Sequence, residues 1–498
     1  MLKKNRCALL FVLVSWVGFA QDGTLDPSFG NDGIIITDID GGYDIGYVVA
    51  QQADHKLVVG GEVTTMGEYL SALIRYMPDG SLDESFGVNG IVTFDLGDGS
   101  DLIKEVFIRE DGKILATVRT GFSSTLRYAI MLFNSNGELD TDFGDNGFLN
   151  ILSDGSGLPK FHMNLLENDL FSLVYLDNEG NDVIRSRYLP NGSVDTSFGN
   201  NGFASSSFEG GSFEISSVRL LDNQSVVLSG YRRYDTFGDV VLMKFLPNGF
   251  LDPDFGDTGV ATKVYEGLEL MEGIRAYADV LGSGKIFVAG GYGSCDSIFQ
   301  PFFLRFLVDG TPDAEFGDDG EVLISGSSTI IKGVIAQENG RILLMGDLVD
   351  CFEGGYHFVR RYFSDGTLDS SFSSQLFNMG QGSSILQSDG KIVTLGNTWW
   401  YDGDVDIFLA RMNNNPLGLE DFEDNNIMAY PNPSEGIFTV DINFLNASEV
   451  DYEVLDVSWK LLQKGVLKSH FNQIDLSEVK TGMYFLRMGS NTIRLLKR

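Results

Sequence analysis

One short phrase recurs seven times along the 498-residue chain, and it constrains the fold more than any other feature. The phrase is Asp-x-x-Phe, and Gly follows the Phe in six of the seven copies. Successive Phe residues are 57, 57, 55, 57, 61 and 56 positions apart, at Phe29, Phe86, Phe143, Phe198, Phe255, Phe316 and Phe372. Intervals this even indicate a repeat architecture, in which each unit stacks on its neighbours to bury a continuous core.

Each repeat predicts four β-strands. A short strand follows the phrase, as at Ile34–Thr37 and Ile91–Phe94, and a hairpin comes later, as at 109–118. The hairpin turns carry Asp-Gly or Asn-Gly, because Gly accepts the positive φ angles that such turns require. A last strand runs into a further Asp-Gly or Asn-Gly before the next phrase, as at 75–80. Four strands in a unit of this length are typical of a β-propeller blade.

The two ends of the repeat region predict a closed ring. The first phrase has no strand before it, whereas the last repeat ends with a strand at 408–412 and lacks a phrase after it. The two fragments complete each other if the N-terminal strand pairs with the last blade, and this closure removes exposed sheet edges. The predicted fold class is therefore all-β. It comprises a seven-bladed β-propeller at 21–412, a linker at 413–426 and a small β-sandwich domain at 427–498.

The repeats resemble the delta-60 repeat family. The patterns R-Y/F-x-x-D/N-G-x-L-D-x-S-F-G and Q-x-D-G-K-I carry the resemblance, which covers about Gln21 to Asn415. It implies a propeller scaffold. It implies no ligand, because the biochemical role of the family is largely undefined.

The N-terminus has the features of a secretory signal peptide at 1–20. Three basic residues precede an apolar run at 9–19, and small residues at Gly18 and Ala20 predict cleavage before Gln21. No other stretch approaches the ~18 apolar residues of a membrane helix. We therefore expect no membrane span after cleavage.

The last 70 or so residues resemble a type A C-terminal sorting domain of the type IX secretion system. The resemblance is carried by Tyr430–Val440 with its Tyr-Pro-Asn-Pro start, by Asp475–Ser477, by Thr481–Arg487 and by the basic end at 497–498. It implies export by the Sec route, handling by the type IX machinery and a final location that is secreted or on the outer cell surface. One departure is Val457-Ser-Trp-Lys460, where the family usually has Gly before the Lys.

Net charge argues against two classes of partner. Asp and Glu number 70 against 35 Lys and Arg, a formal net charge of −35. Nucleic-acid binding depends on Lys and Arg contacts to phosphate, and anionic lipid attracts basic segments in the same way. The chain is therefore not expected to bind either, and its acidic surface should repel polyanions.

A second repeated position precedes the last aromatic residue of six repeats and Met412 of the seventh, and it is basic in six of the seven units. The seven residues are Arg75, Leu132, Arg187, Lys244, Arg305, Arg361 and Arg411. Each of the six basic residues can pair with the Asp of the phrase and brace a corner of its blade. The other interpretation is a ring of cations that binds an anion. Bracing is favoured, because a function rarely needs one copy in every blade.

Strand direction separates two faces of the propeller. The phrase and the Asp-Gly hairpins share one face, and the other two loops of each blade share the opposite, variable face, which we predict to be the working face. Aromatic and basic side chains there suit sugar rings or peptides, and the candidates are Trp399, Trp400, Tyr401, Tyr231, Arg232, Tyr234, Tyr292 and Tyr356. The alternative is that several of them pack beneath their own loops.

Acidic residues offer a calcium site as the only cofactor. Asp402, Asp404 and Asp406 alternate as at the start of a calcium loop, although Ile407 replaces the usual Gly and Asn413 the closing Glu. Further loop acids stand at Asp38, Asp40, Asp44, Asp98 and Asp101. Acidic turn chemistry explains the same residues.

Cys295 and Cys351 occupy equivalent places in adjacent repeats, each 21 residues before the next phrase Phe. A disulfide between blades is left open, because equivalent positions are often farther apart than a disulfide allows.

Motifs for catalysis are weak. The four His residues show no metal-ligand spacing, and no nucleophile or phosphate-binding motif stands in its required context. The favoured function is a binding module for an extracellular glycan or protein. A polysaccharide hydrolase or lyase that uses loop carboxylates, and a structural adhesion component, are the alternatives.

Overall fold

A computed structural model describes most of the chain in two compact units, Met1–Asn415 and Pro416–Arg498. The described residues are 22–65, 67–97, 101–121, 127–151, 161–177, 182–207, 212–234, 237–266, 275–292, 300–324, 329–350, 354–398, 405–414, 428–430, 434, 436–441, 449–456, 460–468, 471–488 and 491–498. The predicted signal peptide and both Cys295 and Cys351 lie outside them. Within these ranges no helix has the length and apolar character needed to cross a membrane.

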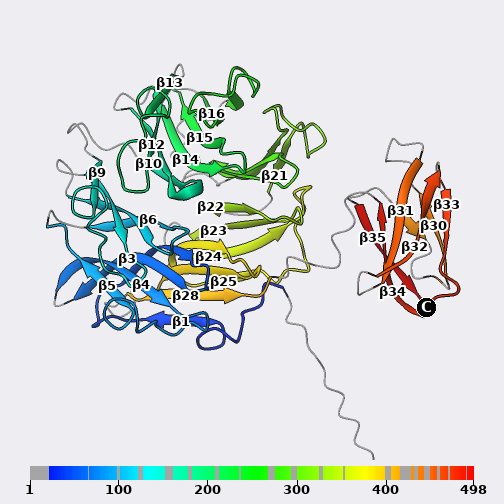
Figure 1. Ribbon diagram of the computed structural model, residues 1–498, viewed down its shortest axis with the longest axis horizontal. Helices are drawn as coiled ribbons and strands as arrows, with labels where there is room; N and C mark the ends of the chain where they lie inside the picture. Colours follow the sequence, from blue (N-terminus) through cyan, green and yellow to red (C-terminus); the bar gives the residue numbers. More distant parts are fainter. Residues whose placement is uncertain are drawn as a thin grey trace, which may run out of the picture. The chain divides into compact units, whose positions relative to one another are not determined.

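The first unit is a β-propeller. Its described residues form seven four-stranded antiparallel sheets around a common centre (Figure 1). The first four sheets are β2 (Ile45–Gln51), β3 (Leu57–Thr65), β4 (Glu68–Tyr76) and β5 (Ile91–Phe94); β6 (Leu102–Ile108), β7 (Ile114–Thr120), β8 (Arg127–Phe133) and β9 (Phe148–Ile151); β10 (Phe161–Leu165), β11 (Phe171–Leu176), β12 (Asp182–Tyr188) and β13 (Phe203–Ser207); and β14 (Ser212–Leu220), β15 (Val226–Arg233), β16 (Phe237–Phe245) and β17 (Val260–Glu266).

The next two sheets are β18 (Arg275–Val280), β19 (Ile286–Tyr292), β20 (Gln300–Phe306) and β21 (Glu321–Leu323); and β22 (Thr329–Ala336), β23 (Ile342–Asp350), β24 (Gly354–Tyr362) and β25 (Gln375–Phe377). The first strand of a blade lies against the first strand of the next, as β14 against β18 and β18 against β22. The predicted four strands per repeat and the all-β class are confirmed.

The seventh sheet closes the ring with a strand from the N-terminus. It is ordered β1 (Ile34–Thr37), β28 (Ile407–Met412), β27 (Ile392–Asn397) and β26 (Gly380–Leu386). β1 pairs antiparallel with β28, with Ile34 opposite Ala410 and Thr37 opposite Ile407. The backbone N–H of Gly23 also donates to the carbonyl of Asn413 at 2.6 Å. The predicted exchange between the two ends of the repeat region is therefore present.

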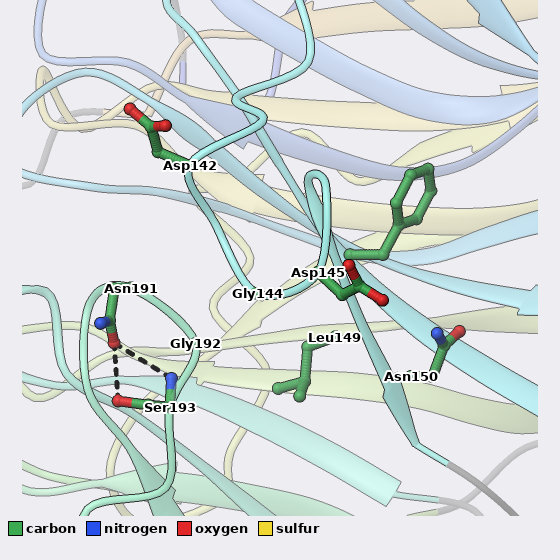
Figure 2. A pocket seen from close by; sticks show the side chains of 9 residues that line it. Asp142, Gly144, Asp145, Leu149, Asn150, Asn191, Gly192 and Ser193 are labelled. Atoms are coloured by element: carbon green, nitrogen blue, oxygen red, sulfur yellow. Dashed lines mark hydrogen bonds between the residues drawn. The ribbon is translucent and has the colours of Figure 1, made fainter.

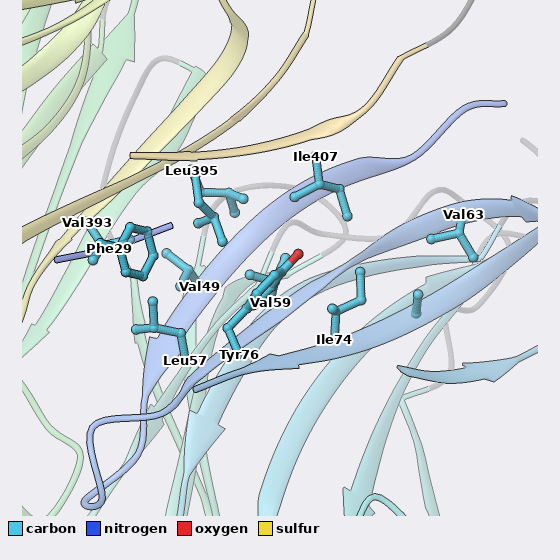
Figure 3. Close-up of a cluster of buried hydrophobic side chains, with 12 residues drawn as sticks. Phe29, Val49, Leu57, Val59, Val63, Ile74, Tyr76, Val393, Leu395 and Ile407 are labelled. Atoms are coloured by element: carbon cyan, nitrogen blue, oxygen red, sulfur yellow. The ribbon is translucent and has the colours of Figure 1, made fainter. Parts of the chain in front are cut away.

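Hydrophobic clusters join each blade to the next. Figure 3 shows the cluster at the ring closure, where Phe29 packs with Val49 and Leu57 of the first blade and with Val393 and Leu395 of the last. All seven Phe residues of the phrase are at most 4% exposed. Burial of a Phe side chain stabilises a fold by roughly 1.5–3 kcal/mol, so the repeated Phe contributes to the core of every blade junction.

The Gly that follows the Phe is required by the backbone. In the six copies its φ lies between +52° and +56°. At Gly317 an added Cβ would stand 2.0 Å from the carbonyl oxygen of Glu321. A side chain is therefore excluded both by the left-handed conformation and by the closeness of the backbone four residues on.

The innermost strands are irregular at equivalent places. Register shifts interrupt five of the seven, and they fall in β2, β6, β14, β22 and β26. A β-bulge turns the following side chains relative to the sheet. This irregularity decides which residues of the innermost strands face the centre of the ring.

The second unit is a small β-sandwich. One sheet contains β29 (Met428–Tyr430), β30 (Ile437–Asp441) and β33 (Phe471–Asp475), and the other contains β32 (Leu461–Lys468), β31 (Glu449–Asp456), β34 (Gly482–Met488) and β35 (Asn491–Lys497). Both sheets contribute to one core, with Phe438, Val454 and Leu486 fully buried. The Nζ of Lys497 donates to three carbonyl oxygens of the segment 476–479, which anchors the basic end of the chain.

Candidate functional site

The Asp of the repeated phrase is the centre of an ionic clamp in every blade. Six of the seven pair with the basic column predicted from the sequence. The pairs and their N···O distances are Arg75–Asp83 (2.8 Å), Arg187–Asp195 (2.7 Å), Lys244–Asp252 (3.0 Å), Arg305–Asp313 (2.7 Å), Arg361–Asp369 (2.7 Å) and Arg411–Asp26 (2.8 Å). The bracing interpretation is confirmed, and the geometry leaves these cations committed to carboxylates.

A second cation reaches the phrase Asp from the hairpin turn on the same face. The repeat pattern did not predict it. The pairs are Lys56–Asp83, Lys113–Asp140, Lys285–Asp313, Arg341–Asp369 and Lys391–Asp26. Lys113 thereby replaces the missing base in the blade where Leu132 stands in the column. The signal was a Lys or Arg directly after the hairpin turn, which is Asp-Gly or Asn-Gly before Lys113, Arg341 and Lys391, Asp-His before Lys56 and Ser-Gly before Lys285.

The clamps also join neighbouring blades. The Nη1 of Arg305 donates to the carbonyl of Ser364 at 2.7 Å, and its guanidinium lies 4.6 Å from the centre of the Phe316 ring. At the ring closure, Arg361 is 1% exposed and its Nη1 also reaches Asn414. Arg75, Arg305 and Arg411 are therefore each held by an ion pair, by stacking on a phrase Phe and by a backbone carbonyl at once.

Electrostatics agrees with this role. Burial raises the pKa of the Asp26 carboxyl, but hydrogen bonds from Ser28 and Lys391 and the charge of Arg411 outweigh it and lower the pKa to about 2. Asp195 and Asp369 are likewise lowered, with Ser197 and Ser371 as hydrogen-bond donors. These three phrase acids are therefore held as structural anions.

A pocket of about 380 Å³ on this face lies at the junction of two blades (Figure 2). Asn191 accepts hydrogen bonds from the backbone N–H and the Oγ of Ser193, and Gly144 donates to the carbonyl of Asn191 at 2.9 Å. The same backbone bond recurs at other junctions, as from Gly87 to Asn136. We therefore attribute this pocket to the packing of adjacent blades and not to a specific binding site.

A larger cavity lies at the centre of the ring. It has a volume of about 680 Å³, and its lining residues come mainly from the innermost strands β6, β10, β14, β18, β22 and β26. The residue directly after the bulge lines it in four blades, namely Glu105, Ser217, Gly333 and Ser383. We call this cavity the central channel.

Charges in the wall of the central channel are balanced. Its lining includes two acids, Glu105 and Asp279, and two bases, Arg219 and Lys332, together with His162. Arg219 Nε lies 3.3 Å from Asp279 Oδ1, and His162 Nδ1 lies 3.6 Å from Glu105 Oε1. In a chain with net charge −35, this wall presents both signs.

Uncharged polar and aromatic groups complete the wall. Asn164 is 7% exposed, and its Nδ2 has no hydrogen-bond partner among the described residues. Phe107 and Tyr277 add aromatic surface. Binding sites commonly combine apolar walls with a few such polar groups, in volumes of ~300–1,000 Å³.

One side of the central channel carries a polar relay. Asp347 Oδ1 lies 2.9 Å from His357 Nδ1, and His357 Nε2 lies 3.4 Å from Ser384 Oγ, which lines the channel. The imidazole is 0% exposed and packs against Gly382. Ser384 Oγ makes a shorter 2.8 Å contact with Thr394 Oγ1. The order of groups is that of a Ser-His-Asp triad, with a long His–Ser separation.

The aromatic residues predicted for the variable face fall into different environments. Tyr231 is 9% exposed, Tyr292 packs 5.3 Å from Tyr265 between ring centres, and Tyr356 is 51% exposed. Arg232 pairs with Asp239 and stacks on Tyr234. Trp399, Trp400 and Tyr401 lie outside the described residues.

The acids predicted for calcium are only partly described. Asp402 and Asp404 lie outside the described ranges, and Ile407 begins β28, so the chain does not continue as a calcium loop of the expected kind. Asp406 instead meets Asp38 and Asp44.

Comparison with known proteins agrees with both units. A secretion system C-terminal sorting domain matches residues 428–498. A beta-propeller domain of unknown function, DUF5122, matches 52–86, 109–143, 281–316, 337–372 and 387–415. The chain carries DUF5122 propeller repeats and a type IX sorting domain. The sorting domain indicates secretion to the cell surface or the extracellular space, whereas the DUF5122 description specifies no activity.

The solved structures that resemble this chain share little sequence identity with it. Polysaccharide lyase Uly1 is 11% identical with a TM-score of 0.48 and covers 74% of this chain and 90% of its own. An exo-beta-1,3-galactanase from Phanerochaete chrysosporium is 10% identical with a TM-score of 0.31, covering 79% and 93%. Drosophila Semaphorin 1a is 8% identical with a TM-score of 0.36, covering 79% and 88%. Likenesses at these TM-scores carry no argument about activity. No curated protein matches the chain.

Proposed function

We propose that the exported propeller is a binding module for an extracellular glycan, and that the glycan is held in the central channel. The observation that supports this proposal is the balanced wall of the channel in a strongly acidic protein. The phrase acids are already neutralised by clamps, so they offer little to a ligand. Polar groups of both signs with aromatic surface suit a neutral sugar chain, whose hydroxyls donate and accept hydrogen bonds.

The test is retention of the purified protein on immobilised neutral and anionic polysaccharides, with release of reducing ends measured in parallel. We expect retention on a neutral glycan without release. Asn164→Leu removes a channel donor at similar volume and should weaken retention about tenfold, the effect of one lost hydrogen bond. Tyr356→Ala is the matched control, because Tyr356 is exposed but does not line the channel.

The outcomes separate the alternatives. Loss of retention in Tyr356→Ala but not in Asn164→Leu would move the site to the variable face. Retention on anionic polysaccharides alone would contradict the argument from the channel wall. Absence of retention on every glycan would favour a protein partner or a structural adhesion role.

Hydrolysis is the second candidate, and the Asp347–His357–Ser384 relay is the observation that favours it. Such a relay supports acyl transfer, so the expected substrates are ester groups on a glycan rather than glycosidic bonds. Ser384→Ala should abolish ester release, whereas Thr394→Val should retain it. The 3.4 Å separation and the buried imidazole place this candidate second.

A further inference from the structure

Three carboxylates meet at the closure of the ring. Asp38 follows β1, Asp44 precedes β2, and Asp406 precedes β28. One carboxylate oxygen from each lies within 4.8 Å of the others. The three acids thus come from the N-terminal segment and from the last blade, which are far apart in sequence.

Asp44 is the member of this group that most needs a partner. It is 0% exposed; its Oδ2 accepts a hydrogen bond from the backbone of Ile39, and its Oδ1 has no hydrogen-bond partner among the described residues. In the described part of the chain, neither Asp38 nor Asp44 forms an ion pair with Lys or Arg. Burial, together with the charges of Asp38 and Asp406, raises the pKa of the Asp44 carboxyl to about 7. A buried carboxylate without a counter-charge is costly.

We propose that Asp38, Asp44 and Asp406 bind a calcium ion that ties the N-terminal strand to the last blade. Calcium takes six to eight oxygen ligands at ~2.3–2.6 Å, so two oxygens on one ion can lie up to about 5 Å apart. The observed spacing meets this limit. Calcium sites of extracellular modules bind at about 10⁻⁴–10⁻³ M, which suits a protein that is exported.

The next blade contains the same loop without the third acid. Asp95 and Asp101 have the six-residue spacing of Asp38 and Asp44. Asp101 is 2% exposed, its Oδ2 accepts from the backbone of Leu96 at 2.6 Å, and its Oδ1 has no partner among the described residues. The loop geometry is therefore a repeated feature of the propeller.

The strand register identifies the difference between the two loops. Continuing the β1–β28 pairing by one residue places Asp406 opposite Asp38. Continuing the β4–β5 pairing in the same way places Leu70 opposite Asp95. The third carboxylate is thus present where the ring closes and replaced by an apolar residue one blade on, so the chain supplies its own control.

The experiment measures the melting temperature of the purified protein after chelation, with and without calcium chloride at about 10 mM, roughly ten times the upper dissociation constant. We expect calcium to raise the melting temperature by roughly 2 to 4 °C. Asp406→Leu copies the residue of the next blade and should abolish the rise. Asp101→Asn weakens the equivalent loop and should keep it. Isothermal titration with calcium chloride provides a second readout, with one site expected in the wild type and none in Asp406→Leu.

An unchanged melting temperature together with no heat of binding in the wild type would overturn the proposal. An equal rise in Asp406→Leu, or loss of the rise in Asp101→Asn, would place the calcium elsewhere and overturn it as well. If Asp406→Leu fails to fold, Asp406→Asn keeps the size of the side chain and tests the same charge. A magnesium arm is included, since equal stabilisation by magnesium would contradict a site that selects calcium.

Discussion

At the scale of single residues, the repeated Asp works as a clamp because cations reach it from two directions. Four of the seven phrase acids have two cations within ion-pair distance, and Asp26 is one example, with Arg411 and Lys391. Asp140 has Lys113 as its ion-pair partner among the described residues. Removing one partner of a mostly buried pair leaves a charge uncompensated, which is more costly than the pair is stabilising.

We predict that Lys113→Met lowers the free energy of unfolding by about 1–3 kcal/mol, because it leaves Asp140 without its cation. The matched control is Lys285→Met, in which Arg305 still neutralises Asp313. The control should lose less than about 1 kcal/mol. Chemical denaturation of both variants measures the difference, and equal losses would show that the second cation is not redundant where two are present.

At the scale of elements, the strands that sequence predicted best are those set by local signals. The sequence predicts Ile34–Thr37 and Ile91–Phe94 to the residue, because each is a short apolar run directly after a fixed turn. Strand β32 is not predicted, since most of its residues are exposed and its apolar residues do not alternate with polar ones. The bulges were missed too, because they depend on how the innermost strands crowd around the centre, which no single repeat specifies.

The central channel was missed for the same reason. Its wall draws on six blades, so no window of sequence contains it. One signal was available: charged residues such as Glu105, Asp279 and Lys332 interrupt apolar strands, where a solvated or ligand-facing position is the simplest explanation. Conversely, the local environment of Tyr231 and Tyr292 depends on packing between strands, which composition did not reveal.

Closure by β1 gives a prediction for this element. Deleting residues 22–37 exposes the edge of β28 and removes Phe29 from the core between the first and last blades. An unpaired edge invites pairing with another chain. We therefore expect self-association, detected by light scattering after size-exclusion chromatography. A matched deletion of the separate unit 416–498 should leave the propeller monodisperse; a monodisperse protein without β1 would contradict the role assigned to this strand.

At the scale of the whole molecule, stability depends on ionised carboxylates. Six of the clamp acids have pKa values held below those of the unfolded chain, namely Asp26, Asp83, Asp140, Asp195, Asp313 and Asp369. They therefore stabilise the fold above about pH 4 and lose that contribution as pH falls through their folded pKa. For Asp26 that value is about 2. We predict that the melting temperature falls steeply between pH 4 and pH 2, as measured by circular dichroism. A constant melting temperature across this window would mean that the clamps contribute little.

Closure of the ring by β1 also sets the order in which the propeller can finish folding. Blades one to six are each continuous in sequence, whereas the seventh combines β1 from the start of the chain with three strands from its end. Contacts between such distant segments form slowly, because the intervening chain must first be ordered. Strand β1 therefore leaves the ribosome before the other strands of the propeller but is among the last of them to find its partner. During export it waits as an unpaired strand until the seventh repeat has followed.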